Sequence, residues 1–381
     1  MKVTNIALAG AAIGLSNAGP VAKRAISDAD ILNYALTLEH LEASFYEEGL
    51  KNYTKEDFMN AGLNVTFYAN LEEIASDEKS HETFLTGALS GKDTSTYNQK
   101  YNNNQIIPAA GASPVARCNY TFPSTDVKSF LALASVLEGV GVSAYLGAAG
   151  SIMNATYLGA AGSILTVEAR HSAYLRAALA ESPSPQAFDN PLDFNEVYTV
   201  ASPFISSCPS SNGALPVKAF PSLTMSSTSA VMTGSTVQLM TGRGFNMSNT
   251  DDIYAAFITV TGPVWATLKS NRKGMFTVTI PKGIAGQSYV VLTKGNKAAT
   301  DDNIVAGPAI VEVGLMMGGM GGSMTTSWPM TGTMMPTGSM GASATASTLP
   351  SQTPFNAAVS SGKGDLFGVL GAAFIAMAAL F

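Results

Sequence analysis

Charged residues are scarce in this 381-residue chain: Asp, Glu, Lys and Arg make up only 13% of it, well below the quarter usual for soluble proteins. The 21 basic residues are outnumbered by 27 acidic ones, so the formal net charge is −6 at pH 7. Nucleic acid is therefore excluded as an expected partner, because it is bound through clustered basic side chains. The charges are densest in the first 180 residues, and the sequence after Val313 has almost none.

Cysteine is also scarce, because the chain has only Cys118 and Cys208. Two cysteines are few for a secreted chain, which excludes a fold held together by many disulfides. Their number is even, and one disulfide between them is the simple prediction for an oxidising compartment. Sequons of the form Asn-x-Ser/Thr are consistent with N-glycosylation in that compartment. They begin at Asn52, Asn64, Asn119, Asn154 and Asn246.

The first 24 residues are typical of a secretory signal followed by a processing site. Lys2 precedes an apolar run over residues 6–15 that is too short to span a bilayer, and Ser16-Asn17-Ala18 offers a small-residue cleavage site. The dibasic pair Lys23-Arg24 resembles sites cut by Golgi processing proteases in fungi, so we expect the mature chain to begin at Ala25. The alternative is a disordered N-terminus.

Residues 357–381 have the order of a GPI-anchor signal, in which small residues precede a spacer and a terminal apolar tail. Asn356 is the predicted attachment residue, and the tail runs from Leu366 to Phe381. Ser360 is an alternative attachment site, although it leaves a spacer of only three residues. A C-terminal membrane helix is the alternative for the tail, which is short for one. We therefore predict a secreted protein anchored to the cell surface, in the outer leaflet of the plasma membrane or in the cell wall, with cell-wall contacts.

Four segments between residues 28 and 181 space their apolar residues as helices do. The first follows the capping residues Ser27-Asp28 and is expected to end near Gly49. The second covers about residues 65–89, the third begins after Asp126, and the fourth ends before Pro183, where a helix must break. The sequence Tyr-Leu-Gly-Ala-Ala-Gly-Ser-Ile occurs twice between the last two helices, and we interpret its small residues as helix packing. The two copies are residues 145–152 and 157–164.

Histidine is also scarce, with three residues, and two of these follow a glutamate by three positions. The pairs are Glu78-Lys-Ser-His81 and Glu168-Ala-Arg-His171. Three residues along a helix place both side chains on one face, roughly 5 to 6 Å apart at Cβ. A carboxylate and an imidazole can then bind one cation together. Two such pairs, on the second and fourth predicted helices, indicate a metal site. The third histidine, His40, is interpreted as structural.

The first and third predicted helices each place a glutamate in an apolar stripe, where a lone carboxylate is costly to bury. These residues are Glu39 and Glu138, and each is followed seven residues later by a tyrosine, Tyr46 or Tyr145. Seven residues are about two turns, so each tyrosine is expected on the same inner face as its glutamate. The tyrosines are candidate electron donors or hydrogen-bond partners of a bridging oxygen; the alternative is that they belong to the bundle core. The remaining acidic residues are interpreted as solvated or as supporting the ligands, with Glu42 as the one to watch. They are Glu42, Glu47, Glu48, Glu72, Glu73 and Glu82.

A Glu from each of two helices and a Glu-x-x-His from each of the other two is the ligand set of di-iron and di-manganese bundles. With that set, the sequence resembles the ferritin-like superfamily and, within it, the fungal secreted ferritin-like family. The resemblance covers about residues 28–182 and implies an antiparallel four-helix bundle with one long crossover, here residues 91–124. It implies two Fe or two Mn ions as cofactors. The implied ligands are Glu39, Glu78, His81, Glu138, Glu168 and His171.

The fold class predicted for the whole chain is mainly α, with a ferritin-like bundle and a C-terminal wrap over residues 25–212. Residues 213–313 shift to a period of two between Gly, Asn and Pro turns, which predicts a small all-β sandwich of immunoglobulin-like type. The expected strands are 237–240, 255–260, 275–280 and 289–292. Residues 314–356 are largely Gly, Ser, Thr and Met and are expected to form a disordered stalk.

These predictions favour a metal-dependent oxidoreductase that oxidises ferrous iron or removes peroxide, because two adjacent redox metals supply two electrons at once. Hard carboxylate oxygens mixed with imidazole nitrogens suit Fe or Mn, and O₂ or peroxide is the expected co-substrate. The alternative is a non-catalytic metal-binding or structural protein of the cell wall, with a role in stress. Storage in a closed shell is disfavoured, because an appended domain, glycans and an anchor obstruct such a shell.

Overall fold

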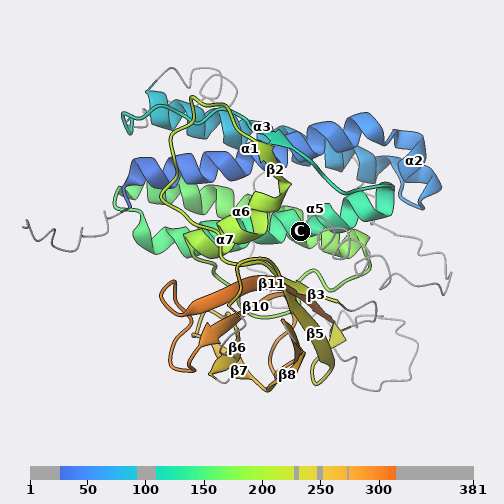
Figure 1. The fold of residues 1–381 in the computed structure, drawn as a ribbon. Helices are drawn as coiled ribbons and strands as arrows, with labels where there is room; N and C mark the ends of the chain where they lie inside the picture. Colours follow the sequence, from blue (N-terminus) through green and yellow to red (C-terminus); the bar gives the residue numbers. More distant parts are fainter. Residues whose placement is uncertain (1–25, 92–108, 227–230, 247–251, 273, 315–381) are drawn as a thin grey trace, which may run out of the picture.

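The computed structural model describes residues 26–91, 109–226, 231–246, 252–272 and 274–314 (Figure 1). The predicted signal sequence, the dibasic site, nearly all of the stalk and both candidate GPI attachment residues lie outside the described residues. The described chain has a helical part followed by a β-rich part, as the sequence predicted. In Figure 1 the helices form one layer and the strands form a second body against it.

Four long helices form the bundle and confirm the helical prediction. They are α1 (Asp28–Asn52), α3 (Val65–Ser90), α5 (Val127–Ala148) and α6 (Ala155–Ala178). Each begins at a side chain that caps a free backbone N–H, which is why the starts were predictable. The capping residues are Ser27, Asn64, Asp126 and Asn154. A short helix, α2 (Lys55–Asn60), and a 3-10 turn, η1 (Ala149–Ser151), lie in the connections.

The first helix was predicted to end near Gly49, but α1 continues past this glycine to Asn52. Gly49 serves a packing role instead. A Cβ at this position would lie 2.0 Å from the Phe130 ring, so only glycine lets α5 approach α1 here. The Phe130 ring stacks on Phe45 at a centroid distance of 4.7 Å, which places an aromatic cluster at this end of the bundle.

Helix α5 is the most apolar element and lies in the centre of the structure. Val127–Ser151 is long and apolar enough to cross a membrane, but 89% of its most apolar window is buried inside the protein. It is therefore a core helix. The bundle covers it on one side and the β-rich part on the other, which leaves few positions for polar side chains.

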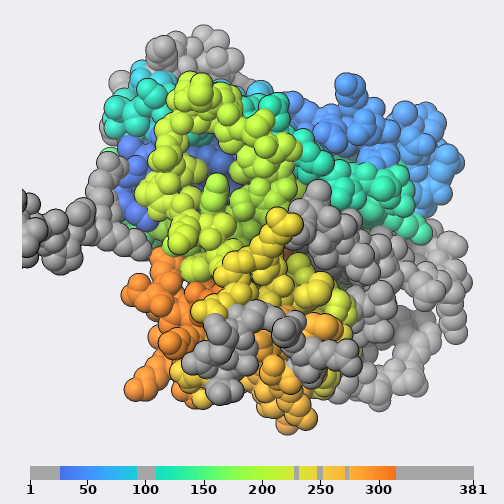
Figure 2. All heavy atoms as spheres, viewed as in Figure 1, coloured from blue at the N-terminus to red at the C-terminus, as the bar shows by residue number. Residues whose placement is uncertain are grey.

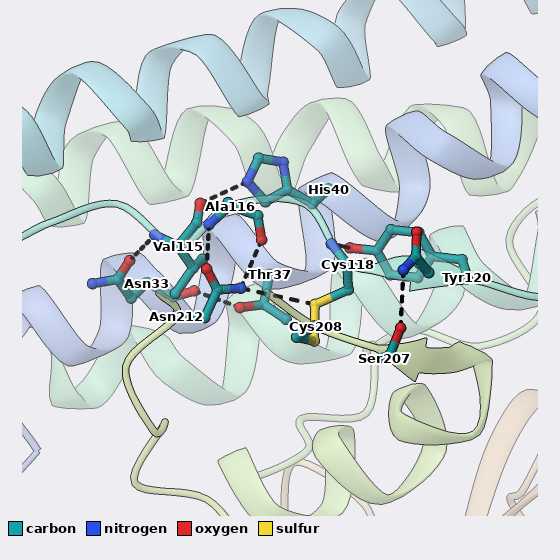
Figure 3. Close-up of a disulfide and its surroundings, with 11 residues drawn as sticks. Asn33, Thr37, His40, Val115, Ala116, Cys118, Tyr120, Ser207, Cys208 and Asn212 are labelled. Carbon is teal, nitrogen blue, oxygen red and sulfur yellow. Dashed lines mark hydrogen bonds between the residues drawn. A yellow bond between two sulfur atoms is a disulfide. The ribbon is translucent and has the colours of Figure 1, made fainter. Parts of the chain in front are cut away.

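The segment after α6 wraps around the bundle before the strands begin. It contains α7 (Phe194–Ala201), η2 (Ser202–Phe204) and β2 (Ile205–Ser207), and β2 pairs with β1 (Asn119–Tyr120) of the crossover. A disulfide joins Cys118 and Cys208 across 90 residues beside this pair (Figure 3). Figure 2 shows the segment in yellow-green, lying across the bundle. The bundle, crossover and wrap are thus fastened into one unit.

Among the described residues after 222, nine strands form two sheets. The order β4-β11-β10-β6-β7 makes one sheet and β3-β5-β9-β8 the other. All the pairings in these two sheets are antiparallel except that of β4 with β11, which is parallel. The predicted β-rich region is thus confirmed, while its immunoglobulin-like type stays a prediction. The strands are β3 (Leu223–Met225), β4 (Val231–Met232), β5 (Thr236–Thr241), β6 (Ile253–Phe257), β7 (Val264–Ala266), β8 (Leu268–Arg272), β9 (Met275–Thr279), β10 (Gly286–Lys294) and β11 (Ile304–Gly314).

The four predicted strands correspond to β5, β6, β9 and β10, while β11 was missed although it is the longest. Its sequence is apolar at nearly every position and includes Pro308, so it lacks the alternation of a half-exposed strand. It is buried on both faces because β11 and β10 lie between the second sheet and the bundle (Figure 1). The side chains of Tyr289 and Ile310 join the hydrophobic core of the bundle.

Candidate metal centre

The six predicted ligands come together in the middle of the bundle, with contributions from all four long helices. The carboxylates of Glu39, Glu78, Glu138 and Glu168 are fully buried. The imidazoles of His81 and His171 are 9% and 6% exposed. Each ligand lies on the inward face of its helix, as the helical spacing in the sequence predicted.

The six residues form two overlapping groups, each of which has the atoms to hold one metal ion. Glu39, Glu78, His81 and Glu168 make the first group, and Glu78, Glu138, Glu168 and His171 make the second. Within each group, one ligand atom per residue lies within 4.8 Å of every other. Glu78 and Glu168 belong to both groups, so they would bridge two ions if both groups were occupied. Glu39 and Glu138 each belong to one group, so each would be a terminal ligand.

Both imidazoles turn Nδ1 toward the carboxylates. The Nδ1 atom of His81 lies 3.3 Å from Glu39, 3.4 Å from Glu78 and 3.2 Å from Glu168. The Nδ1 atom of His171 lies 2.9 Å from Glu78 and 3.3 Å from Glu138. Each imidazole thus presents Nδ1 to at least two of the buried carboxylates.

Unpaired polar atoms at the centre show that a metal pair suits it. Buried polar groups normally have hydrogen-bond partners, yet several ligand atoms here make no hydrogen bond to the residues that the structure describes. They are Glu39 Oε2, Glu78 Oε1, Glu138 Oε2, both carboxylate oxygens of Glu168, and His171 Nδ1. Four carboxylates carry a formal charge of −4, which two divalent cations balance. The donor set therefore fits two Fe or two Mn ions.

Each tyrosine of the predicted pairs holds the glutamate of the opposite helix. The Tyr46 hydroxyl on α1 donates to Glu138 on α5, and the Tyr145 hydroxyl on α5 donates to Glu39 on α1. Burial raises the pKa of both phenols well above the ordinary value of 10.0, so both remain donors. Their contacts are with the terminal carboxylates, and this crossed arrangement fixes each one in orientation.

One residue that sequence reasoning missed is Asp77, immediately before Glu78. Its Oδ2 atom lies 3.4 Å from His171 Nε2, the ring nitrogen that faces away from the centre. A carboxylate on the outer nitrogen fixes the ring of a metal-bound histidine and increases its basicity. The Asp77 side chain is 38% exposed, so it connects the centre to the surface. The available signal was an acidic residue adjacent to a Glu-x-x-His pair.

A fifth buried carboxylate, Glu42, borders the centre on α1, one turn after Glu39. Burial, together with the charges of Glu168 and Glu39, raises the pKa of Glu42 well above 4.5. Gly141 on α5 makes room for it: a Cβ there would lie 3.0 Å from both Glu42 Oε1 and Glu168 Oε2. Any larger residue at 141 would press on two carboxylates. The signal for Glu42 in the sequence was its spacing of three residues from Glu39.

The metal-free centre holds protons where a metal would bind. Burial, and then the charge of Glu138, raises the pKa of Glu78 to about 7. Burial alone would lower the pKa of His171, but its contacts with the Asp77 and Glu138 carboxylates raise it to about 12. Metal ligands must be deprotonated, so metal binding releases protons from this site.

Glu82 is not solvated but buried, at 7% exposure. It lies 2.8 Å from His40 Nδ1 and accepts a hydrogen bond of 2.8 Å from Arg117 Nε. Burial opposes ionisation here, but the bonds from His40, Arg117 and Lys79 prevail and lower the pKa of Glu82. His40 also lies 2.9 Å from the Val115 carbonyl (Figure 3), so it has the structural role predicted for it. This network fastens the crossover to α1 and α3 beside the first ligand group.

The predicted glycosylation residues lie outside the centre, among the described residues. Those at 52, 64, 119 and 246 are exposed and that at 154 is half-buried. Asn64 and Asn154 use the side-chain oxygen to cap helices, which leaves the amide nitrogen, the atom that carries a glycan, outside the cap. The Asn119 amide nitrogen instead donates to Ser207 at 2.9 Å. Glycosylation at these positions stays a prediction.

Residues 27–181 match the family model of the ferritin-like domain, the same stretch that builds the bundle and supplies all six candidate ligands. The helical part of this chain is therefore a ferritin-like domain. The chain is similar to Protein rds1 of the fission yeast Schizosaccharomyces pombe, with 23% identity over 196 residues. The matched region is 51% of this chain and 44% of rds1, so the chain spans less than half the length of that protein.

Proposed function

We propose that this protein is a cell-surface ferritin-like oxidoreductase with a di-iron or di-manganese centre. The observation that carries the proposal is the pair of overlapping ligand groups, which share Glu78 and Glu168. Glu78 and Glu168 would hold both ions close together, so that the pair could act as one redox unit. Two-electron reactions, either ferrous-iron oxidation with O₂ or peroxide removal, are the chemistry that such a pair supplies when bound.

The protein residues hold and orient this centre and control its protons. Glu39 and Glu138 are terminal carboxylates whose orientation depends on Tyr145 and Tyr46. Glu78 gives up its proton near neutral pH, since its pKa is about 7. The apolar core around α5 excludes bulk water, which strengthens each electrostatic contact in the site.

Three sequence features support a location outside the cell: the predicted signal sequence, the GPI-anchor signal and the sequons. The disulfide between Cys118 and Cys208 suits an oxidising compartment. In this proposal the anchor places the bundle at the plasma membrane or in the cell wall, on a fungal cell surface. Release of the protein from intact cells by a phosphatidylinositol-specific phospholipase tests the anchor.

A second candidate function is metal binding without turnover, as a structural or stress protein of the cell wall. The complete burial of all four carboxylates favours it, because structural ions lie in closed sites. The two functions differ in whether the centre reacts with O₂ or peroxide.

Metal analysis of the secreted protein, followed by ferroxidase and peroxide assays, tests the proposal. We expect two Fe or Mn ions per chain and turnover that is lost in Glu168→Gln. The matched control is Glu73→Gln, an exposed position on α3. Two bound ions without turnover would favour the structural alternative, and a folded protein that binds no metal would refute both.

A further inference from the structure

An apolar pocket lies at the end of the bundle where α1 and α6 begin and α3 and α5 end. Its volume is about 30 Å³. All four helices contribute to its wall, for example through Leu32 and Ala35 of α1, Leu85 of α3, Ala148 of α5 and Ala161 of α6. The pocket is a site of its own, since none of the six metal ligands lines it.

The internal repeat builds this pocket, which gives the repeat more than a packing role. Its first copy contributes Ala148 and Ile152, and its second copy contributes Ala160 and Ala161. The leading tyrosine of each copy, at 145 and 157, also lies in the wall. Alanines at these positions leave space that larger side chains would fill.

The turn between the two copies is fixed by the first residue of α1. The Asp28 carboxylate accepts hydrogen bonds from the backbone N–H groups of Met153 and Asn154, at 2.8 and 2.9 Å. Asp28 itself borders the pocket. Its carboxylate is thus occupied by the turn, and the inner wall of the pocket remains apolar.

Tyr145 joins the pocket to the metal centre. Its side chain forms part of the pocket wall, and its hydroxyl donates to Glu39, a terminal ligand of the first group. Tyr145 is 7% exposed, so a buried side chain extends from the pocket wall to that carboxylate. A molecule in the pocket therefore contacts a residue that is hydrogen-bonded to the first ligand group.

We propose that this pocket binds dioxygen on its way to the Glu39 end of the centre. A cavity needs about 10–15 Å³ of such volume to hold one water, so this one has room for a molecule of two or three atoms. Apolar cavities of this kind stay free of water and take up apolar gases. Hydrogen peroxide is disfavoured, because its hydroxyl groups would be buried in this pocket without hydrogen-bond partners, which is costly.

This inference rests on the proposed function and chooses between its two oxidants. With ferrous iron as substrate the reaction balances as follows: two Fe²⁺ ions lose one electron each, and one O₂ takes up both electrons and two protons to give H₂O₂.

Xenon binding to crystals of the metal-free protein tests the pocket without any variant. We expect xenon density between Ala35, Ala148 and Ala161, and its loss in Ala161→Leu. The matched control is Ala177→Leu, an exposed position on the same helix, which keeps the density. Absence of xenon from the wild-type pocket would overturn the proposal and would leave the metal centre unaffected.

Stopped-flow oxidation of the ferrous-loaded protein tests the assignment of dioxygen. We expect the second-order rate constant with O₂ to fall about tenfold in Ala161→Leu. The leucine side chain would fill the pocket, and the close-packed interior cannot open an equivalent space elsewhere. Ferrous binding and the rate with H₂O₂ should stay at wild-type values. An unchanged O₂ rate in a variant that has lost xenon would overturn the dioxygen route. A wild-type protein that binds no metal would refute the proposed function and the dioxygen assignment together.

Discussion

Removal of the charge of a bridging ligand should lower the number of bound metal ions more than the same change at a terminal ligand. Glu78 belongs to both ligand groups, whereas Glu138 belongs only to the second. We expect Glu138→Gln to keep one ion, since the first group remains whole, and Glu78→Gln to keep none. Wild-type protein should hold two ions. Glutamine preserves the size of the side chain, so the comparison isolates charge and coordination.

Glu78→Gln should also stabilise the metal-free protein. Two ionised ligand atoms 4.8 Å apart repel by about 3 kcal/mol at an effective dielectric constant of about 20. The pKa of Glu78 leads to a similar figure: the difference between about 7 and the ordinary 4.5 corresponds to about 3 kcal/mol at 1.36 kcal/mol per pH unit. Because this pKa is raised, the folded, metal-free state loses stability as pH rises from 4.5, and the full cost is present above pH 7. Glu78→Gln removes that cost.

The assay combines metal analysis with thermal unfolding of the metal-free proteins at pH 8. About 3 kcal/mol raises Tm by roughly 6–12 °C for a domain of this size. The exposed Glu73→Gln on the same helix should change neither the ion count nor Tm. Equal metal content in Glu78→Gln and Glu138→Gln would refute the bridging assignment. A lower Tm of metal-free Glu78→Gln would refute the electrostatic reasoning.

Two further predictions concern positions around the centre and at the wrap. Gly141→Ala should stabilise the metal-free helix by about 1 kcal/mol but weaken metal binding about tenfold, because the new Cβ would crowd Glu42 and Glu168; an unchanged metal Kd would contradict this crowding. Burial raises the pKa of Glu196 to about 8, so its contribution to stability is full below pH 4.5 and is lost as pH rises through 8. Glu196→Gln should flatten that part of the stability–pH curve measured by urea unfolding, whereas the exposed Glu48→Gln should not.

The starts of the bundle helices and the metal ligands were predictable because their signals are local. A capping side chain satisfies backbone N–H groups within three residues, as Ser27 and Asp126 do. A Glu-x-x-His pair defines one face of one helix, whatever packs against it. The helix end predicted near Gly49 was displaced because this glycine makes room for the ring of Phe130, which lies on another helix, and does not end α1.

The candidate site was predictable in its membership but not in its connections. The sequence paired Tyr46 with Glu39 by spacing, but the structure pairs Tyr46 with Glu138, 92 residues away. The difference between bridging and terminal glutamates also has no local signal. It depends on how far each helix is shifted along its axis relative to its neighbours, and side-chain periodicity does not encode that shift.

The sequence by itself thus determined a four-helix bundle with two matching Glu-x-x-His pairs, since these depend on contacts within single helices. The tertiary structure alone decided three features: the crossed tyrosine contacts, the room that Gly141 leaves for Glu42, and the pocket built by the repeat. Each joins residues from separate helices. The physical reason is that periodicity specifies which face of a helix is buried, whereas close packing of several helices specifies what that face meets.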